Sequence, residues 1–397
     1  MSTATHTPGA ATPAARCRDD EAFGGGDGHA LISHVQAWAH ANLIPLNASI
    51  ETTLRCNIRC QHCYNFDRDA TRSPCTGEEK TASAPGPELS ADEILRVMTD
   101  LRAAGCLFLS LTGGEVLMHP QLVLFLDHAR ALNLSVQLLT NGTLLRPGMA
   151  RRLAGYPNLL GVSVSVYGAT PAVHDGITQV AGSWRRTWDG AARLRALGVA
   201  VRVKLIVMRA NAHEAAAMRA MAAERGLSYL VDLTITSRHD GDDSSLATRV
   251  TRDQLEALYR GPLRDLVPTG ARPVSEESFP CNCARGNVAI SARGDVYPCV
   301  SVPLSAGNIR SQPFKDIWAA SPVFQRLRGL RIADYAQCAP CPHSRHCARD
   351  RGAAFNASGS YTGVDPFVCA TAEIAHALAD EAAPAAEPAR VRLKVAG

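Results

Sequence analysis

The sequence predicts an α/β protein in which a partial (β/α)6 TIM-like barrel is followed by a small cysteine-rich domain. Three observations predict this fold. Apolar strand patterns alternate with helical stretches between residues 46 and 236, and seven of the 13 cysteines gather between residues 281 and 369. At 397 residues, the chain is long enough for one large core and a second, smaller one.

The first predicted strand leads directly into a group of cysteines. Residues 1–45 are expected to be a mostly flexible segment with a short helix near Leu31–Ala41. The alternating stretch Asn47–Thr53 predicts a strand that ends just before Cys56. The segment Asp67–Leu89, which is rich in Thr, Ser, Pro, Gly and charged residues, is expected to be a surface insertion.

Strands and helices alternate regularly after this insertion. Ser90 and Glu93 have the spacing of a capping box, which predicts the start of a helix that ends at Gly105. The later strands are predicted at Leu107–Thr112, Ser135–Thr140, Leu159–Val166, Val199–Val207 and Tyr229–Thr236. About six βα units make a partial barrel, in which the active-site loops lie at the C-terminal ends of the strands.

The chain is therefore expected to divide into five parts. A polar stretch follows the last predicted strand, and no cysteine occurs again before residue 281. We expect an N-terminal segment at 1–45, the barrel at 46–236, a linker with a helix at 237–280, the cysteine-rich domain at 281–372 and a C-terminal tail at 373–397.

Composition excludes several classes of partner. The net charge of +4 comes from 41 basic and 37 acidic residues without a basic stripe, so we expect no nucleic acid partner. No apolar run reaches the roughly 20 residues that span a bilayer, and the N-terminus has no apolar signal core. We expect a soluble, cytoplasmic protein without a membrane partner, and in that compartment grouped cysteines indicate metal binding rather than disulfides.

The first cysteine group, Cys56, Cys60 and Cys63, has the spacing C-x3-C-x2-C. Three thiolates in a compact loop can hold three irons of a four-iron cubane and leave the fourth iron open. An open iron can chelate the amino and carboxylate groups of a methionine. A structural zinc site is the alternative, but zinc takes four ligands in a closed geometry, and His62 next to Cys63 is poorly placed as the fourth.

Motifs at the ends of the following strands, combined with this group, resemble the radical S-adenosylmethionine (radical SAM) superfamily. The resemblance extends to Val207 and implies a [4Fe–4S] cluster on Cys56, Cys60 and Cys63. It also implies reductive cleavage of SAM to a 5′-deoxyadenosyl radical, which abstracts hydrogen from a substrate. It assigns the cofactor-binding role to His62, Gly113, Gly114, Glu115, Asn141, Ser163 and Ser165.

The later cysteines, together with Gly294, resemble the SPASM pattern of auxiliary iron–sulfur domains, which implies one or two further clusters. By this resemblance one cluster is held by Cys338, Cys341, Cys347 and Cys369, and the other by Cys281 or Cys283 together with Cys299. A zinc ribbon is the alternative for the C-x2-C pair.

The chain departs from the SPASM pattern at Arg351, where related chains often have a cysteine and where arginine cannot bind iron. Three arrangements of the second auxiliary cluster therefore remain open. It uses Cys281, Cys283 and Cys299 and keeps an open iron, it recruits another ligand, or it is absent. The candidates for that other ligand are His343, His346 and Asp350.

The resemblance implies modification of a ribosomally made peptide or protein by crosslinking, epimerisation or oxidation. A radical SAM modification of a small molecule or tetrapyrrole is the alternative, and a non-catalytic metal-binding or electron-carrier protein is a third. Recognition of a peptide would need a separate leader-peptide-binding protein or the insertion at Asp67–Leu89. The chemistry also implies a flavodoxin or ferredoxin-type reductant. The sequence assigns no catalytic base and no oligomeric state.

Overall fold

The computed structural model describes residues 28–65, 86–239, 242–267 and 275–382. Most of the insertion predicted at Asp67–Leu89 therefore lies outside the described residues. Helix α1 (Gly28–Ala41) confirms the short helix expected near Leu31–Ala41. The division of the chain into five parts stays a prediction.

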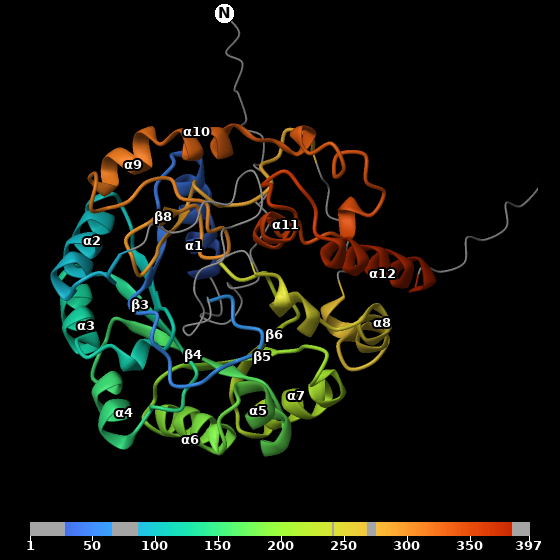
Figure 1. Cartoon of the computed structure of the whole chain (residues 1–397), viewed down its shortest axis with the longest axis horizontal. Helices are drawn as coiled ribbons and strands as arrows, with labels where there is room; N and C mark the ends of the chain where they lie inside the picture. The colour runs from blue at the N-terminus through green and yellow to red at the C-terminus, as the bar shows by residue number, and fades with distance from the viewer. Residues whose placement is uncertain (1–27, 66–85, 240–241, 268–274, 383–397) are drawn as a thin grey trace, which may run out of the picture.

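Six parallel strands follow one another in chain order across one sheet, as predicted. They are β1 (Asn47–Glu51), β2 (Phe108–Thr112), β3 (Ser135–Thr140), β4 (Leu159–Val166), β5 (Val201–Ile206) and β6 (Ser228–Asp232). The helices between them form the outer layer in Figure 1, namely α2 (Ala91–Ala103), α3 (Leu122–Ala131), α4 (Pro147–Ala154), α5 (Pro171–Thr178), α6 (Ser183–Ala196) and α7 (Ala215–Glu224). The predicted partial barrel is confirmed.

The two faces of the sheet differ in polarity because side chains alternate along each strand. In β3, Val136 and Leu138 are buried, whereas Gln137 between them is partly exposed. The buried set packs with the helices in the main hydrophobic core, which leaves the polar set for the barrel interior. The interior face is therefore available for chemistry.

Helix α2 begins where the sequence predicts. The Ser90 hydroxyl accepts a bond from the Glu93 backbone N–H at 3.2 Å, and the Glu93 carboxylate accepts one from the Ser90 N–H at 2.8 Å. Gly105, with φ +101°, turns the chain into β2.

Helix α5 was not predicted. Its start is defined by Thr170, whose hydroxyl caps the Val173 N–H.

Two short strands extend the sheet beyond the prediction. Strand β7 (Asn287–Ile290) pairs in parallel with β1, and β8 (Val296–Tyr297) pairs antiparallel with β7. Pairing with β7 satisfies the backbone edge that β1 would otherwise expose. The cysteine-rich segment is therefore continuous with the barrel sheet.

The C-terminal part of the chain is mainly helical and lies along the top and right of Figure 1. It contains α8 (Arg252–Arg260), α9 (Phe314–Ala320), α10 (Pro322–Gly329), α11 (Arg351–Ser358) and α12 (Pro366–Ala382). Short 3-10 helices lie at Val116–Met118, Ala212–Glu214, Ser244–Thr248, Arg264–Leu266, Ile332–Asp334 and Ser344–His346. Helix α12 crosses the predicted boundary at residue 373 because its apolar side buries Ile374, Ala375 and Leu378.

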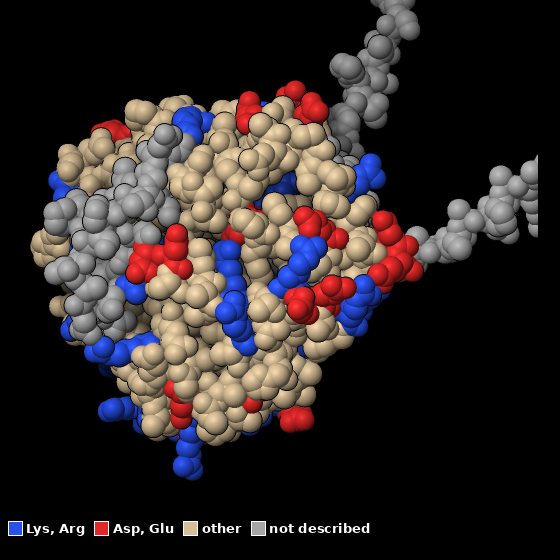
Figure 2. Space-filling model, turned by 45° about the vertical axis from the view of Figure 1, so that its right-hand side comes forward, with Lys and Arg blue, Asp and Glu red and all other residues tan. Residues whose placement is uncertain are grey.

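Among the described residues, no helix combines the length and the apolar character needed to cross a membrane. Acidic and basic side chains are interspersed on the face shown in Figure 2.

A buried ion pair joins the segment before α8 to the start of α12. Arg249 donates two bonds to Asp365, at 2.8 and 2.6 Å, and the Asp365 side chain is 0% exposed.

We expect Asp365→Ala to lower the free energy of unfolding by roughly 3–5 kcal/mol, because it leaves the Arg249 charge poorly solvated and without its partner. Urea unfolding measures this change. The control is Glu373→Gln, which removes the exposed ion pair with Arg252 and should cost less than about 1 kcal/mol. Equal effects of the two variants would contradict the role of the buried pair.

Candidate functional site

The first cysteine group lies in the loop that follows β1, at the C-terminal end of the barrel strands. Cys56, Cys60 and Cys63 are half-buried. The C-terminal end of α5 holds this loop, since the Arg59 N–H donates to the Thr178 carbonyl at 2.9 Å. The unpredicted helix α5 is therefore part of what positions the three thiols.

The end of β2 packs against the start of the cysteine loop. The Gly114 N–H donates to the Thr53 carbonyl at 2.6 Å, and the Glu115 N–H donates to the Arg55 carbonyl at 2.8 Å. Gly113 has φ +138°, and a Cβ on Gly114 would overlap the carbonyl oxygens of residues 54 and 55. The two glycines thus let the backbone after β2 approach residues 53–55 closely.

Glu115 fastens the ends of β2 and β3 together. Its carboxylate is 1% exposed and accepts bonds from the Thr140 hydroxyl at 2.6 Å, the Asn141 N–H at 2.7 Å and the Leu117 N–H at 3.0 Å. Burial raises the pKa of Glu115, although these three donors oppose the shift. The side chain thus orients its neighbours by hydrogen bonds within the protein.

Asn141 faces the cysteine loop. Its side-chain N–H donates to Cys56 Sγ at 3.8 Å and to the Asn57 side-chain oxygen at 2.9 Å. The Asn141 oxygen accepts bonds from the backbone and the hydroxyl of Thr143. Sequence reasoning missed Asn57 and Thr143, although the position of Asn57 inside the C-x3-C spacing was a signal.

The fourth strand reaches the same loop through Tyr167, which sequence reasoning also missed. Ser163 and Ser165 alternate on β4 and are partly exposed toward the interior. The buried Tyr167 hydroxyl is hydrogen-bonded to Cys60 and Ser165, and burial raises the pKa of Tyr167 well above its usual range. The Tyr167 ring lies 4.9 Å from the ring of His62.

His62 has a buried Nδ1 without a hydrogen-bond partner. Burial lowers the pKa of His62 to about 4, and the nearby Lys204 ammonium contributes a smaller part of this shift. The imidazole is therefore neutral at pH 7. Lys204 forms an ion pair of 2.7 Å with Asp232 across β5 and β6. An orphaned polar nitrogen beside the three cysteines fits a site that a bound group completes.

A buried carboxyl group lies at the end of β1. The Tyr64 hydroxyl donates to Glu51 at 3.3 Å, and the Tyr64 ring lies 4.6 Å from that of His239. Burial raises the pKa of Glu51 to about 7, while bonds from Ala292 and Tyr64 oppose the shift. Sequence reasoning missed Glu51, although it is the last residue of a strand that ends at the candidate site.

The seven later cysteines form two groups. In one, the Cys283 N–H donates to Cys281 Sγ at 3.3 Å, and the thiol of Cys283 is hydrogen-bonded to those of Cys281 and Cys299. In the other, burial raises the pKa of Cys369, and three nearby thiols raise it further. These three belong to Cys338, Cys341 and Cys347. The structure therefore places Cys283 beside Cys281 and Cys299, and Cys369 within electrostatic reach of Cys338, Cys341 and Cys347.

Arg351 acts through its positive charge on one cysteine of each set, since it lowers the pKa of Cys281 and opposes the raised pKa of Cys347. Its guanidinium donates to the Gly363 carbonyl at 3.1 Å and lies 4.7 Å from the centre of the Tyr335 ring. A bond from Cys283 lowers the pKa of Cys281 to about 7, and the Arg351 charge contributes to this shift. Arg351 thus brings a positive charge to the position where the SPASM pattern has a thiolate.

The contacts described for the three residues proposed as a replacement ligand are with other groups. The rings of His343 and His346 lie 4.9 and 5.2 Å from that of His376 on α12. The Asp350 carboxylate caps α11 by accepting the Ala353 N–H at 2.9 Å. None of these contacts involves the three-thiol group.

The donor sets fit iron–sulfur clusters. The Tyr335 hydroxyl is buried without a hydrogen-bond partner and lies near the thiols of Cys281, Cys283 and Cys338. In the described ranges, no three His, Cys, Asp or Glu side chains are placed to hold one metal ion. That spacing is a requirement for a single ion, whereas thiolates of a cluster are distributed around several irons.

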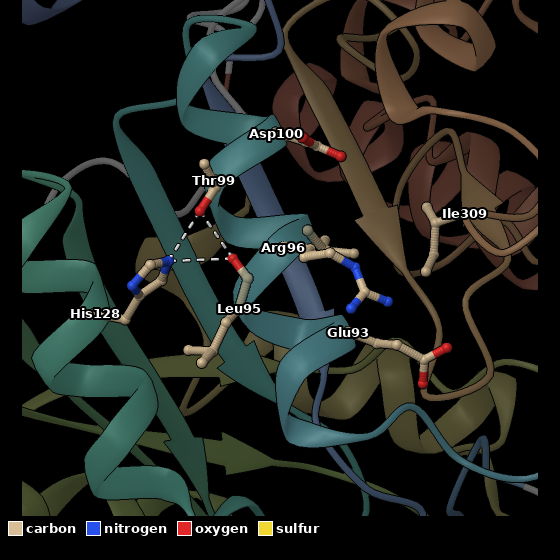
Figure 3. A pocket seen from close by; sticks show the side chains of 8 residues that line it. Glu93, Leu95, Arg96, Thr99, Asp100, His128 and Ile309 are labelled. Atoms are coloured by element: carbon tan, nitrogen blue, oxygen red, sulfur yellow. Dashed lines mark hydrogen bonds between the residues drawn. The ribbon is translucent and has the colours of Figure 1, made fainter.

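The pocket in Figure 3 is separate from all three cysteine groups. It has a volume of about 340 Å³ on the outer side of α2, where His128 Nε2 lies 2.9 Å from the Thr99 hydroxyl and 3.1 Å from the Leu95 carbonyl. Its lining residues are Glu93, Leu95, Arg96, Val97, Thr99, Asp100, His128 and Ile309. These residues carry no thiol, so the candidate site stays at the strand ends.

Comparison with known proteins matches two family models to this chain. The radical SAM superfamily matches residues 50–219, and the SPASM iron–sulfur cluster-binding domain matches residues 281–342. The AdoMet-dependent heme synthase of Methanosarcina barkeri is 29% identical to this chain. The aligned part spans 80% of this chain and 94% of the heme synthase. The subtilosin biosynthesis protein AlbA of Bacillus subtilis is 27% identical to this chain. The aligned part spans 77% of this chain and 66% of AlbA.

The fold is shared with a solved structure. Streptococcus suis SuiB bound to its precursor peptide SuiA has a TM-score of 0.60 and 15% identity, covering 89% of this chain and 85% of that chain. At this identity the likeness concerns the fold. It agrees with the partial barrel and the cysteine-rich C-terminal region described above.

We expect Gly114→Ala to lower the free energy of unfolding by roughly 1–3 kcal/mol, because the added methyl group overlaps backbone oxygens that cannot move freely. Urea unfolding measures the change. Gly148→Ala is the matched control, since it lies in α4 with open space around it and should be neutral or stabilising by up to about 1 kcal/mol. An unchanged stability of Gly114→Ala would contradict the close packing.

The buried Glu51 predicts a pH dependence. Its pKa in the fold, about 7, lies above the ordinary 4.5, so its contribution to stability is complete below pH 4.5 and is lost as the pH rises through 7. Glu51→Gln should therefore reduce the loss of stability between pH 5 and pH 8 by roughly 1–3 kcal/mol. Urea unfolding at both pH values measures it, with the exposed Glu256→Gln as control. Parallel pH profiles for wild type and Glu51→Gln would refute the expectation.

Proposed function

Because the chain is a radical SAM enzyme with a SPASM domain, we propose that Cys56, Cys60 and Cys63 hold its [4Fe–4S] cluster and that it modifies a ribosomally made peptide or protein. One observation carries the placement of the site. Asn141 and Tyr167, at the ends of the third and fourth strands, hydrogen-bond to Cys56 and Cys60. The cysteine loop and the strands predicted to contact SAM therefore meet at one place.

When bound, the cluster and SAM supply a 5′-deoxyadenosyl radical that abstracts hydrogen from the substrate. The protein's own residues prepare the site for them. Hydrogen bonds from Asn141 and Tyr167 to thiolates stabilise negative charge on sulfur. Tyr167, buried beside Ile58 and Met208, helps to keep water away from the cysteines.

The contacts with SAM are proposed for the strand-end residues in two roles. His62, with its orphaned Nδ1, and the inward-facing Ser163 and Ser165 offer polar atoms to the cofactor. The second role is positioning, because these residues are engaged mainly with the protein itself. It belongs to Gly113, Gly114, Glu115 and Asn141.

We also propose the ligand sets of the auxiliary clusters. Cys338, Cys341, Cys347 and Cys369 form a complete set of four thiols for one cluster. Cys281, Cys283 and Cys299 form a three-thiol set for the other.

A peptide or protein substrate is supported by the peptide-related neighbours. AlbA is a bacteriocin biosynthesis protein, and SuiB has been solved with a precursor peptide. A flavodoxin or ferredoxin-type reductant and a separate leader-peptide-binding protein complete the proposal. The similarity to a heme synthase, at 29% identity over 345 residues, favours a tetrapyrrole as the second candidate substrate.

The first test measures 5′-deoxyadenosine. Anaerobically reconstituted wild type, given SAM and dithionite, should form it, whereas a variant with Cys56, Cys60 and Cys63 changed to Ala should lose at least about 100-fold of this activity while keeping auxiliary iron. The reason is that the three thiols are the proposed ligands of the cluster that delivers the electron. Equal product from both proteins would sink the assignment.

The substrate is tested separately. Wild type that forms 5′-deoxyadenosine is incubated with candidate precursor peptides and, in parallel, with a tetrapyrrole precursor of heme. A mass change in a peptide that depends on SAM supports the peptide proposal. Conversion of the tetrapyrrole alone would replace it with the second candidate.

A further inference from the structure

One sulfur of the three-thiol group (Cys281, Cys283 and Cys299) is surrounded by hydrogen-bond donors. Cys281 Sγ accepts a bond from the Cys283 N–H at 3.3 Å and lies 2.9 Å from the Tyr361 hydroxyl. Tyr361 is buried, with 1% of its surface exposed. While Cys281 is a free thiol, either atom of the contact with Tyr361 can be the donor. The direction of this hydrogen bond therefore depends on what the sulfur binds.

Iron binding fixes the direction of the hydrogen bond between Tyr361 and Cys281. A cysteine that holds iron has lost its proton, so its sulfur can only accept. A tyrosine hydroxyl ordinarily keeps its proton up to about pH 10, so it is the donor. The pair then forms a charge-assisted bond in which the negative charge lies on the sulfur. In this arrangement the Tyr361 oxygen contacts a ligand sulfur and is not itself a ligand of iron.

A buried positive charge acts on the same sulfur. Arg351 is 5% exposed, and its described hydrogen bonds go to carbonyl oxygens, which carry no net charge. Its charge acts on Cys281 and also on Cys347 of the four-thiol set. The Asp350 carboxylate feels this charge as well, but that group caps α11. A hydrogen bond and a positive charge therefore both favour negative charge on Cys281.

We propose that Tyr361 is a positioning residue that raises the reduction potential of the cluster held by Cys281, Cys283 and Cys299, through its hydrogen bond to Cys281. When this cluster takes up one electron from an added reductant, the negative charge on its sulfurs grows. The bond from Tyr361 then becomes stronger, so it stabilises the reduced state more than the oxidised state. The hydroxyl proton stays on the Tyr361 oxygen in both states. The inference rests on the proposed function only in that the three thiols hold a cluster.

Tyr335 provides a matched control because it lies near the same thiols without bonding to them. Its hydroxyl is buried near Cys281, Cys283 and Cys338, but it has no hydrogen-bond partner. Tyr335→Phe and Tyr361→Phe each remove one buried phenol oxygen beside the cysteines. Only Tyr361→Phe also removes a hydrogen bond to sulfur, so a difference between the two variants reports that bond.

The experiment uses the full chain with Cys56, Cys60 and Cys63 changed to Ala, reconstituted anaerobically with iron and sulfide, so that iron reports only the auxiliary sites. This parent protein is reduced stepwise with dithionite at measured potentials, and the reduced clusters are followed by electron paramagnetic resonance. The signal that Cys281→Ala removes belongs to the three-thiol cluster.

At the potential where this cluster is half reduced in the parent protein, Tyr361→Phe should lower its ratio of reduced to oxidised form about three- to tenfold, because a hydrogen bond to a charged sulfur is lost. This change corresponds to roughly 30–60 mV at 59 mV per tenfold for one electron. The iron content and the potential of the four-thiol cluster should stay the same. Tyr335→Phe should leave both potentials unchanged.

An unchanged ratio in Tyr361→Phe, or equal shifts in Tyr361→Phe and Tyr335→Phe, would overturn the proposal. Loss of iron from the three-thiol group alone in Tyr361→Phe would do the same, since a hydrogen-bond donor is not needed to hold iron.

A misfolded Tyr361→Phe is recognised because the four-thiol group would lose its iron as well. In that case Tyr361 is replaced by fluorotyrosine, which keeps the hydroxyl and makes it a stronger donor. The ratio of reduced to oxidised cluster should then rise, and an unchanged or lower ratio would overturn the proposal. If Cys281→Ala removes no signal, the three thiols hold no cluster and the inference fails. Failure of the proposed function is a separate result, since it appears as absent 5′-deoxyadenosine in wild type.

Discussion

The candidate site depends on the close contact between the end of β2 and the start of the cysteine loop. The backbone of Gly113 and Gly114 approaches residues 53–55 at hydrogen-bonding distance, and no side chain fits between them. Glu115 then ties this contact to the end of β3 with two further bonds, from the Thr140 hydroxyl and the Asn141 N–H. Asn141, which follows β3, therefore lies next to Cys56. The close contact between β2 and residues 53–55 thus positions both the cysteine loop and a residue that contacts it.

The sheet connects the two cysteine-rich regions of the chain. Strand β7 begins four residues after Cys283 and pairs with β1, whose other end leads to Cys56. The β1 edge is satisfied by this pairing, since an unpaired edge would expose backbone groups. The separation between the first cysteine group and the three-thiol group is therefore set by a rigid sheet and not by a linker.

Much of the fold follows from local pattern. Strands β3 and β4 have the predicted bounds because their alternation is long and regular, and α2 begins at a capping box that Ser90 and Glu93 specify. Helix α5 and strand β7 were missed because eight and four residues carry too little periodicity. Strand β6 ends at Asp232, before the predicted Thr236, where the Asp232 carboxylate accepts a bond from the Thr234 N–H and turns the chain.

The sequence by itself determined the spacing of the cysteine groups, the order of the barrel strands and the radical SAM family, because these depend on neighbours in the chain. Only the tertiary structure decided which residues touch the thiols. Tyr167, Glu51 and Tyr361 gain their roles from contacts with residues that are at least 13 positions away, namely Cys60, Tyr64 and Cys281. Burial sets the chemistry of such groups, and burial is a property of packing that no local spacing encodes.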